Sequence, residues 1–181
     1  MKFFRRLSYR EYRLAIVMGF VDGVLTALLL ASGRIFDKGI EMTVPMALRI
    51  ATGALATAGF VFYIGRYTEL RYKLVRAETQ LNLVQRGRLA TTSLGRKVLY
   101  DAIREAALSG VSSFVSAFIP LILASALPSL PLISLISSLF ILGIMGRIIA
   151  KAVKGSPFIW TVNLVMGGIL MTLAGFWLHL V

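Results

Sequence analysis

Hydrophobic residues gather into five long runs, and the segments between them carry most of the charged residues. The runs cover residues 14–33, 43–65, 106–127, 131–150 and 157–180. Each has about 20 residues, the length that a helix needs to cross a hydrocarbon core of ~30 Å. The third and fourth runs are joined by "PSLP", in which Pro128 and Pro131 end one helix and begin the next. The pattern predicts an all-α integral membrane protein with five transmembrane helices.

The longest polar segment, residues 66–105, lies between the second and third runs. Apolar residues follow one face of a predicted helix there, at spacings of four and three: Leu70, Leu74, Ala77, Leu81 and Val84. A turn is predicted at "QRGRLATTS", and a second helix from about Ser93 into the third run. Two interpretations stay open: a basic amphipathic helical segment that rests on anionic lipid or packs beneath the bundle, and a ligand-binding or regulatory segment. Its carboxylates are too scattered to indicate a metal-binding cluster: Glu69, Glu78, Asp101 and Glu105.

The composition agrees with a membrane protein and excludes several classes of site. Hydrophobic residues make up 57% of the 181 residues, charged residues only 15%, and the mean hydropathy is +0.81. Soluble domains have about 45–50% apolar and about 25% charged residues. The chain has no cysteine and a single histidine, His179, which argues against disulfides, thiolate or histidine-rich metal sites and a Ser-His-Asp triad. The runs offer no nucleophile–base pair, so we do not expect an enzyme.

The positive charges predict the orientation of the chain. The net charge is +12, but the basic residues lie between the apolar runs, so we expect no nucleic-acid partner. Five Lys and Arg precede the first run, nine lie between the second and third, and three lie near or just beyond the end of the fourth (Arg147, Lys151 and Lys154); the opposite side carries only Arg34 and Lys38. Cytoplasmic loops are enriched in Lys and Arg. We therefore predict a cytoplasmic N-terminus and an outer C-terminus, in the cell membrane of a prokaryote.

The first run, which is too long for the core of a signal peptide, carries a carboxylate. In "GFVDGVLTALLLASG", Asp22 lies near the middle of the run and shares a helical face with Gly19 and Thr26. An ionised carboxylate there costs at least ~2.5–3.5 kcal/mol, so intramembrane acids are usually functional. Met18 lies one turn before Asp22 and is a weaker candidate ligand. Gly19, Gly23 and Gly33 are candidates for close helix packing, including a contact between two copies of the chain, because a GxxxG pair such as Gly19 and Gly23 lets two helix backbones approach.

Four further polar positions lie in the other runs. Arg49 either extends outward to water or pairs with Asp22 on the neighbouring helix. Ser116 and Pro120 share a face of the third run, where the proline either frees a carbonyl oxygen for a cation or simply kinks the helix. Asn163, on the fifth run, serves either helix packing or transport.

Several stretches together resemble the vacuolar iron transporter family. "GFVDGVLTALLLASG" resembles its first helix, "SAFIPLILASALP" its third helix, and "GIMGRIIAKAVKGSPFIWTVNLVMGGILMTLAGFWL" its last two helices with their basic linker. In "VFYIGRYTE", Gly65 and Tyr67 match the end of the family's second helix, whereas Phe62 and Arg66 replace its methionine and glutamate. The short basic segment stands where the family has a larger, glutamate-rich metal-binding domain.

The resemblance implies a homodimer in which the first helices face each other and a cation path runs between the two protomers. Asp22 of both chains would bind a divalent cation such as Fe2+ or Mn2+, exchanged for protons, with Thr26 and Met18 assisting. The cation is the substrate, and no cofactor is implied. The alternative hypothesis is a non-transporting membrane protein with the same fold, in which Asp22 and Arg49 form a structural pair and the basic segment binds lipid or a partner.

Overall fold

The computed structural model describes residues 2–36, 43–80, 91–126 and 132–177, and of these the side chains of 2–11, 31 and 33–36 are left aside. Within these ranges the chain forms five helices and no strand. The helices are α1 (Lys2–Phe36), α2 (Val44–Gln80), α3 (Ser93–Ala126), α4 (Leu132–Val153) and α5 (Pro157–Trp177). All five are long and apolar enough to cross a membrane. The prediction of an all-helical membrane protein with five candidate spans is confirmed at this level.

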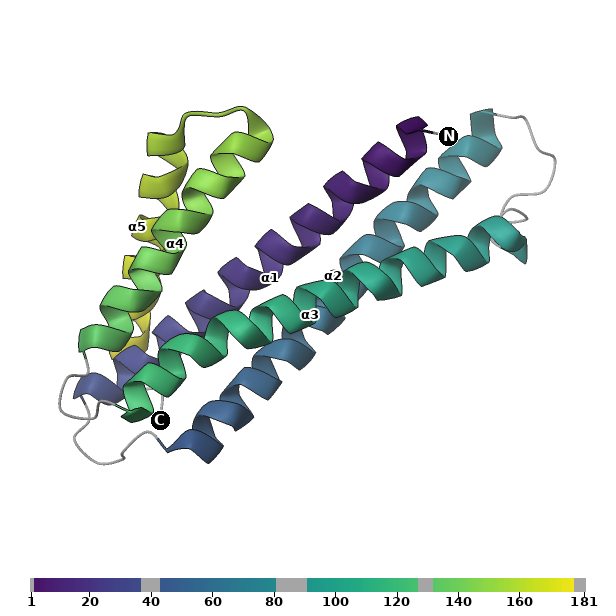
Figure 1. Cartoon of the computed structure of the whole chain (residues 1–181). Helices are drawn as coiled ribbons and strands as arrows, with labels where there is room; N and C mark the ends of the chain where they lie inside the picture. The colour runs from purple at the N-terminus through teal and green to yellow at the C-terminus, as the bar shows by residue number, and fades with distance from the viewer. Residues whose placement is uncertain (1, 37–42, 81–90, 127–131, 178–181) are drawn as a thin grey trace.

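Helix α1 lies between two helix pairs, α2 with α3 and α4 with α5 (Figure 1). It contacts all four other helices. One apolar core joins α1 to α2 and α3 and is built mainly of small residues, such as Ala27, Ala51 and Ala117. A second core joins α1 to α4 through Val24, Leu28 and Leu142. The arrangement makes α1 the central helix of the bundle.

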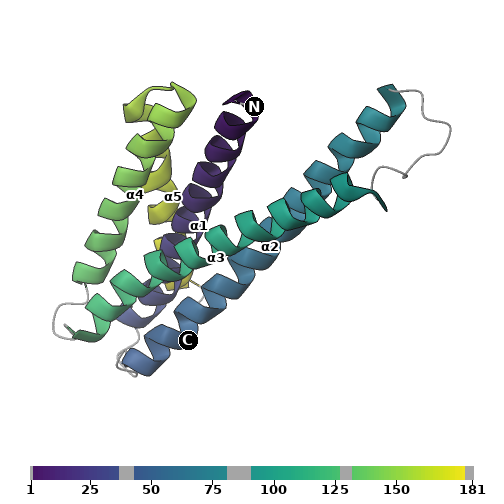
Figure 2. The ribbon, with the colours of Figure 1, turned by 45° about the vertical axis from the view of Figure 1, so that its right-hand side comes forward.

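Helices α2 and α3 extend far beyond the length of a membrane span. They have 37 and 34 residues, which corresponds to about 55 Å and 51 Å of helix against a hydrocarbon core of ~30 Å. They run side by side and project away from the other helices (Figure 2). The polar segment is helical where it is described: the helix predicted from about Ser93 into the third run is α3, and α2 also continues into the segment, to Gln80, without a break. Residues 81–90, which include Leu81, Val84 and most of the predicted turn, lie outside the described residues.

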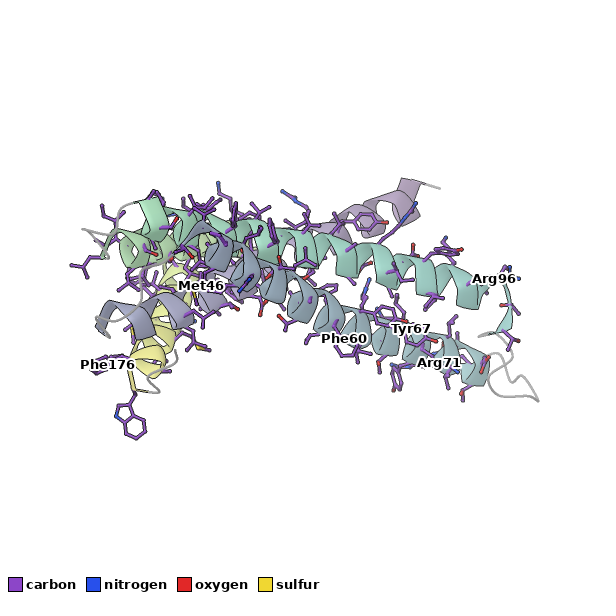
Figure 3. All side chains as sticks on the ribbon, turned by 90° about the horizontal axis from the view of Figure 1, so that it is seen from below. Met46, Phe60, Tyr67, Arg71, Arg96 and Phe176 are labelled. Carbon is purple, nitrogen blue, oxygen red and sulfur yellow. The ribbon has the colours of Figure 1, made fainter. Side chains whose placement is uncertain are left out.

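The outer surface of the bundle is strongly apolar. Large side chains that face outward include Phe60, Phe140 and Phe158, which are 66%, 69% and 77% exposed. Such a surface is unfavourable in water but fits a lipid environment. Figure 3 shows Tyr67, Arg71 and Arg96 toward the far end of the α2–α3 pair, whereas Met46 and Phe176 lie at the opposite end of the molecule. The surface agrees with an integral membrane protein whose α2–α3 extension carries polar groups.

Candidate functional site

The glycines of α1 pack against α3 of the same chain. A Cβ atom added to Gly19 would overlap the backbone carbonyl of Ser109, and one added to Gly23 would overlap the carbonyl of Ser113. Only glycine allows the two backbones to lie this close. The prediction that Gly19 and Gly23 pack against a second copy of the chain is therefore corrected: the helix that packs closely against them is α3 of the same chain. Gly33 lies in α1, but its surroundings lie outside the described residues.

Asp22 lies at the edge of this contact. Its Oδ2 atom accepts a hydrogen bond from the hydroxyl of Ser113, with an Oγ–Oδ2 distance of 3.2 Å. The same hydroxyl lies 3.3 Å from the backbone oxygen of Ala54 on α2. Because a serine hydroxyl carries one proton, it donates to one of these oxygens at a time. Ser113 thus joins α1, α2 and α3 at the level of the carboxylate, and the rest of the Asp22 side chain is exposed.

Arg49 does not pair with Asp22. The buried face of α2 is formed by Ala47, Ala51, Ala54 and Ala58. At 100° per residue, Arg49 points almost opposite to this face, and it is exposed. No ion pair joins Arg49 to Asp22, although both residues are described. The proposed structural pair is corrected for this rotational reason, and the outward orientation of Arg49 agrees with its other interpretation.

A cleft of about 440 Å³ opens beside Asp22 between α1, α2 and α3. Asp22 and Met18 line it from α1, Phe62 and Arg66 from α2, and Glu105 and Ser109 from α3. Met18 is 55% exposed, so its thioether reaches the same space as the carboxylate. Phe62 and Arg66 therefore belong to the cleft that contains Asp22.

Arg66 links two carboxylates at one end of this cleft. Its Nε atom lies 2.6 Å from Oε2 of Glu105, and its Nη2 atom donates to Oε1 of Glu105 at 3.3 Å. Its Nη1 atom lies 2.7 Å from Oε2 of Glu69, whose other oxygen lies 2.6 Å from Nζ of Lys73. The side chains of Arg66 and Glu105 are only 9% and 4% exposed. Arg66 and Glu105 therefore form a buried ion pair, and Glu69 and Lys73 extend the network to exposed positions.

Glu69 and Glu105 are 36 residues apart in the chain, and Arg66 brings these two of the four carboxylates of the polar segment together. One signal could have found the pair. Arg66 directly follows the second apolar run, and Glu105 directly precedes the third. In an antiparallel pair of helices, these two ends lie at the same level. Hydrogen bonds from Lys73 and Arg66 hold the pKa of Glu69, which lies beyond the second run, below its usual range.

A buried polar face of α3 connects the ion pair to Asp22. Glu105, Ser109 and Ser113 follow one another at spacings of four residues, and all three are buried. The helix rise places Ser113 about 12 Å from Glu105 along the axis of α3. The hydroxyl of Ser116, one turn further on, donates to the backbone oxygen of Ser113 at 3.1 Å. Ser116 thus supports the site without contacting the carboxylate.

The remaining predicted residues lie at different distances from the site. The hydroxyl of Thr26 donates to the backbone oxygen of Asp22 at 3.0 Å, so the carboxylate is not its hydrogen-bond acceptor. Pro120 is buried within α3, which continues to Ala126, and its carbonyl accepts a hydrogen bond from Ser134 of α4 at 3.0 Å. Asn163 is exposed on α5, apart from the residues that line the cleft. Among the described residues, no group of three or more His, Cys, Asp or Glu side chains is placed to hold a metal ion.

No protein family, curated protein or solved structure matches this chain. The resemblance to the vacuolar iron transporter family thus stays a prediction from the quoted sequence stretches. The geometry of the cleft carries the functional argument.

Proposed function

We propose that this chain is a membrane transporter of divalent cations and that the carboxylate of Asp22 binds the transported ion. Asp22 is the one acidic residue inside the five apolar runs. It is exposed in a cleft, where the hydroxyl of Ser113 is the one hydrogen-bond donor to its carboxylate among the described residues. This combination of membrane depth, exposure and sparse neutralisation is the observation that carries the proposal. A bound cation or proton would offset the cost of the charge.

The chemistry of one carboxylate supports exchange of a cation for protons. A proton and a metal ion bind the same oxygen atoms, so binding of one favours release of the other. Carboxylate and hydroxyl oxygens suit hard ions such as Mn2+, and Met18 adds a softer sulfur donor that also suits Fe2+. The cleft therefore supports transport of iron or manganese with proton exchange.

We further propose that two copies assemble with their α1–α2 clefts facing each other. A lone cleft would expose Asp22 sideways to lipid, where an unneutralised carboxylate is costly. A second copy would cover this opening and supply a second carboxylate, and the described residues of one chain lack a three-donor group. The proposed orientation places the N-terminus and the α2–α3 extension in the cytoplasm, because the basic residues gather on that side.

The test is Mn2+ uptake into proteoliposomes that contain the full chain. Asp22→Asn keeps the size of the side chain and the acceptor for Ser113, but removes the charge. We expect it to reduce uptake to the level of empty liposomes, while expression and oligomeric state stay unchanged. Asn163→Ala is the matched control, because Asn163 also lies in a span but away from the cleft; its uptake should equal that of wild type. Undiminished uptake by Asp22→Asn would refute the proposal.

A further inference from the structure

Among the described residues that line the cleft, Arg66 is the one cation. Its Nη2 atom donates to Glu105, its Nη1 atom donates to Glu69, and its Nε atom lies close to the second oxygen of Glu105. Glu105 lies on the same polar face of α3 as Ser113, which contacts Asp22. Glu105, which Arg66 binds, and Ser113, which contacts Asp22, are about 12 Å apart along α3, so the charge of Arg66 lies on the order of 12 Å from the Asp22 region of the cleft. Arg66 thus occupies the end of the cleft toward the α2–α3 extension.

Among the described side chains, the charges at this end of the cleft cancel. Two carboxylates, Glu69 and Glu105, are matched by two cations, Arg66 and Lys73. An acidic opening would concentrate divalent cations, since clefts lined by one sign of charge focus the electrostatic potential. Here Arg66 and Lys73 already bind both carboxylates. The described side chains therefore leave this end of the cleft close to neutral.

A purely structural role for Arg66 would be to fasten α2 to α3. These helices already meet closely on another face, where Gly110 packs against the backbone of Leu55 and Gly59. A buried ion pair is, in addition, weak evidence for stabilisation, because desolvation of both charges offsets their attraction. The position of Arg66 at the opening of the cleft points to an electrostatic role.

We propose that Arg66 is a specificity-determining residue of the cleft: it neutralises the opening and so limits the affinity of Asp22 for divalent cations. This inference rests on the proposed function, in which Asp22 binds the cation. A positive charge about 12 Å from a divalent ion weakens its binding by roughly three-fold to ten-fold at low salt. The effect is electrostatic and therefore decreases as salt is added.

The experiment measures Mn2+ binding by electron paramagnetic resonance, on the full chain in nanodiscs of zwitterionic lipid. Arg66→Gln should bind Mn2+ roughly three-fold to ten-fold more tightly than wild type at ~50 mM salt, with a much smaller gain at ~500 mM. Arg66→Lys keeps the charge and should bind as wild type does. Arg104→Gln is the matched control: Arg104 is the neighbour of Glu105, but it is exposed and lies outside the cleft. Its Mn2+ affinity should stay at the wild-type value.

A second variant keeps the test valid if Arg66→Gln fails to fold, because it leaves Glu105 buried without its cation. Glu69 is 49% exposed, so Glu69→Gln should fold. It makes the opening positive and should weaken Mn2+ binding, again more strongly at low salt. An unchanged affinity in Glu69→Gln, or equal affinities in folded Arg66→Gln and Arg104→Gln, would overturn the inference.

The same measurement on Asp22→Asn separates this inference from the proposed function. If Asp22→Asn leaves Mn2+ binding unchanged, the proposed function fails, whatever the Arg66 variants do. If Asp22→Asn abolishes binding but the Arg66 and Glu69 variants bind as wild type does, the role of Arg66 fails and the proposed function stands.

Discussion

Two neighbouring faces of α1, offset by one residue along the chain, differ sharply in how closely other helices pack against them. On one side, Ala15, Gly19 and Gly23 are buried, and at Gly19 and Gly23 the backbone of α1 lies in close contact with that of α3. On the next side, Leu14, Met18 and Asp22 line the open cleft toward α2. Both sets repeat every four residues, so each forms a continuous stripe along the helix.

The difference indicates that side-chain size determines where the helices of this bundle pack closely. Residues without bulk let α3 approach until hydroxyl and carbonyl groups meet. The larger residues of the neighbouring stripe keep α2 away and leave space beside the carboxylate. Asp22 belongs to the open stripe but reaches Ser113 on the closed side, so the close contact positions the group that faces the cleft.

The largest expected effect comes from filling the closed side. Gly23→Ala introduces a Cβ atom that overlaps the carbonyl of Ser113 and the hydroxyl of Ser116. We expect the free energy of unfolding to fall by about 2–3 kcal/mol, because overpacking forces the helices apart. Equilibrium unfolding in detergent, followed by tryptophan fluorescence, measures it.

Gly65→Ala, on α2 across the open cleft from α1, is the matched control. Gly65 lines the cleft, and an added Cβ atom there meets no atom within 4 Å. Its free energy of unfolding should stay unchanged or rise by up to about 1 kcal/mol, because alanine favours a helix over glycine. Equal destabilisation by the two alanines would contradict the contrast between the sides.

A smaller effect is expected in chemical accessibility, which the absence of native cysteines makes simple to measure. Met18→Cys places a thiol in the cleft, where Met18 is 55% exposed, and Ala15→Cys places one against α3, where Ala15 is 0% exposed. We expect a water-soluble methanethiosulfonate reagent to modify residue 18 at least about ten-fold faster, since reaction needs an accessible thiolate.

Mn2+ sharpens this test. If the cation binds at Asp22, one turn from Met18, saturating Mn2+ should slow the modification of Met18→Cys. Similar rates for the two thiols would show that the open side is closed to water in the membrane.

The smallest effect is expected for the hydroxyl groups around Asp22. Ser113→Ala removes the donor to the carboxylate and should lower the free energy of unfolding by about 1 kcal/mol. Mn2+ uptake should fall by a few fold, because the carboxylate is less well positioned. Thr26→Val is the control, since its hydroxyl donates only within α1, to the backbone of Asp22; we expect a change below about 0.5 kcal/mol. A larger loss in Thr26→Val than in Ser113→Ala would reverse the assignment of the positioning group.

The sequence by itself determined the number, type and approximate positions of the helices. Five apolar runs of sufficient length form helices in lipid, because every buried peptide group must be hydrogen-bonded within its own helix. It also singled out Asp22, since a carboxylate inside such a run is costly wherever the helix packs. The sequence also predicted the helix from Ser93 into the third run, but not that the second run continues as one helix to Gln80, because the polar stretch after residue 65 was treated as separate from that span.

Only the tertiary structure decided which groups meet. The spacing of Gly19 and Gly23 predicts close packing, but it does not say which helix approaches, and α3 does so within the same chain. From the sequence, Arg49 and Asp22 lie at depths in the membrane that would allow them to pair, yet the rotation of α2 about its axis points Arg49 away from the buried face of that helix. Arg66 and Glu105 are 39 residues apart in the chain and come level because α2 and α3 run antiparallel. Local pattern fixes the depth and the face of each residue, whereas the rotation and pairing of whole helices depend on packing summed over their full length.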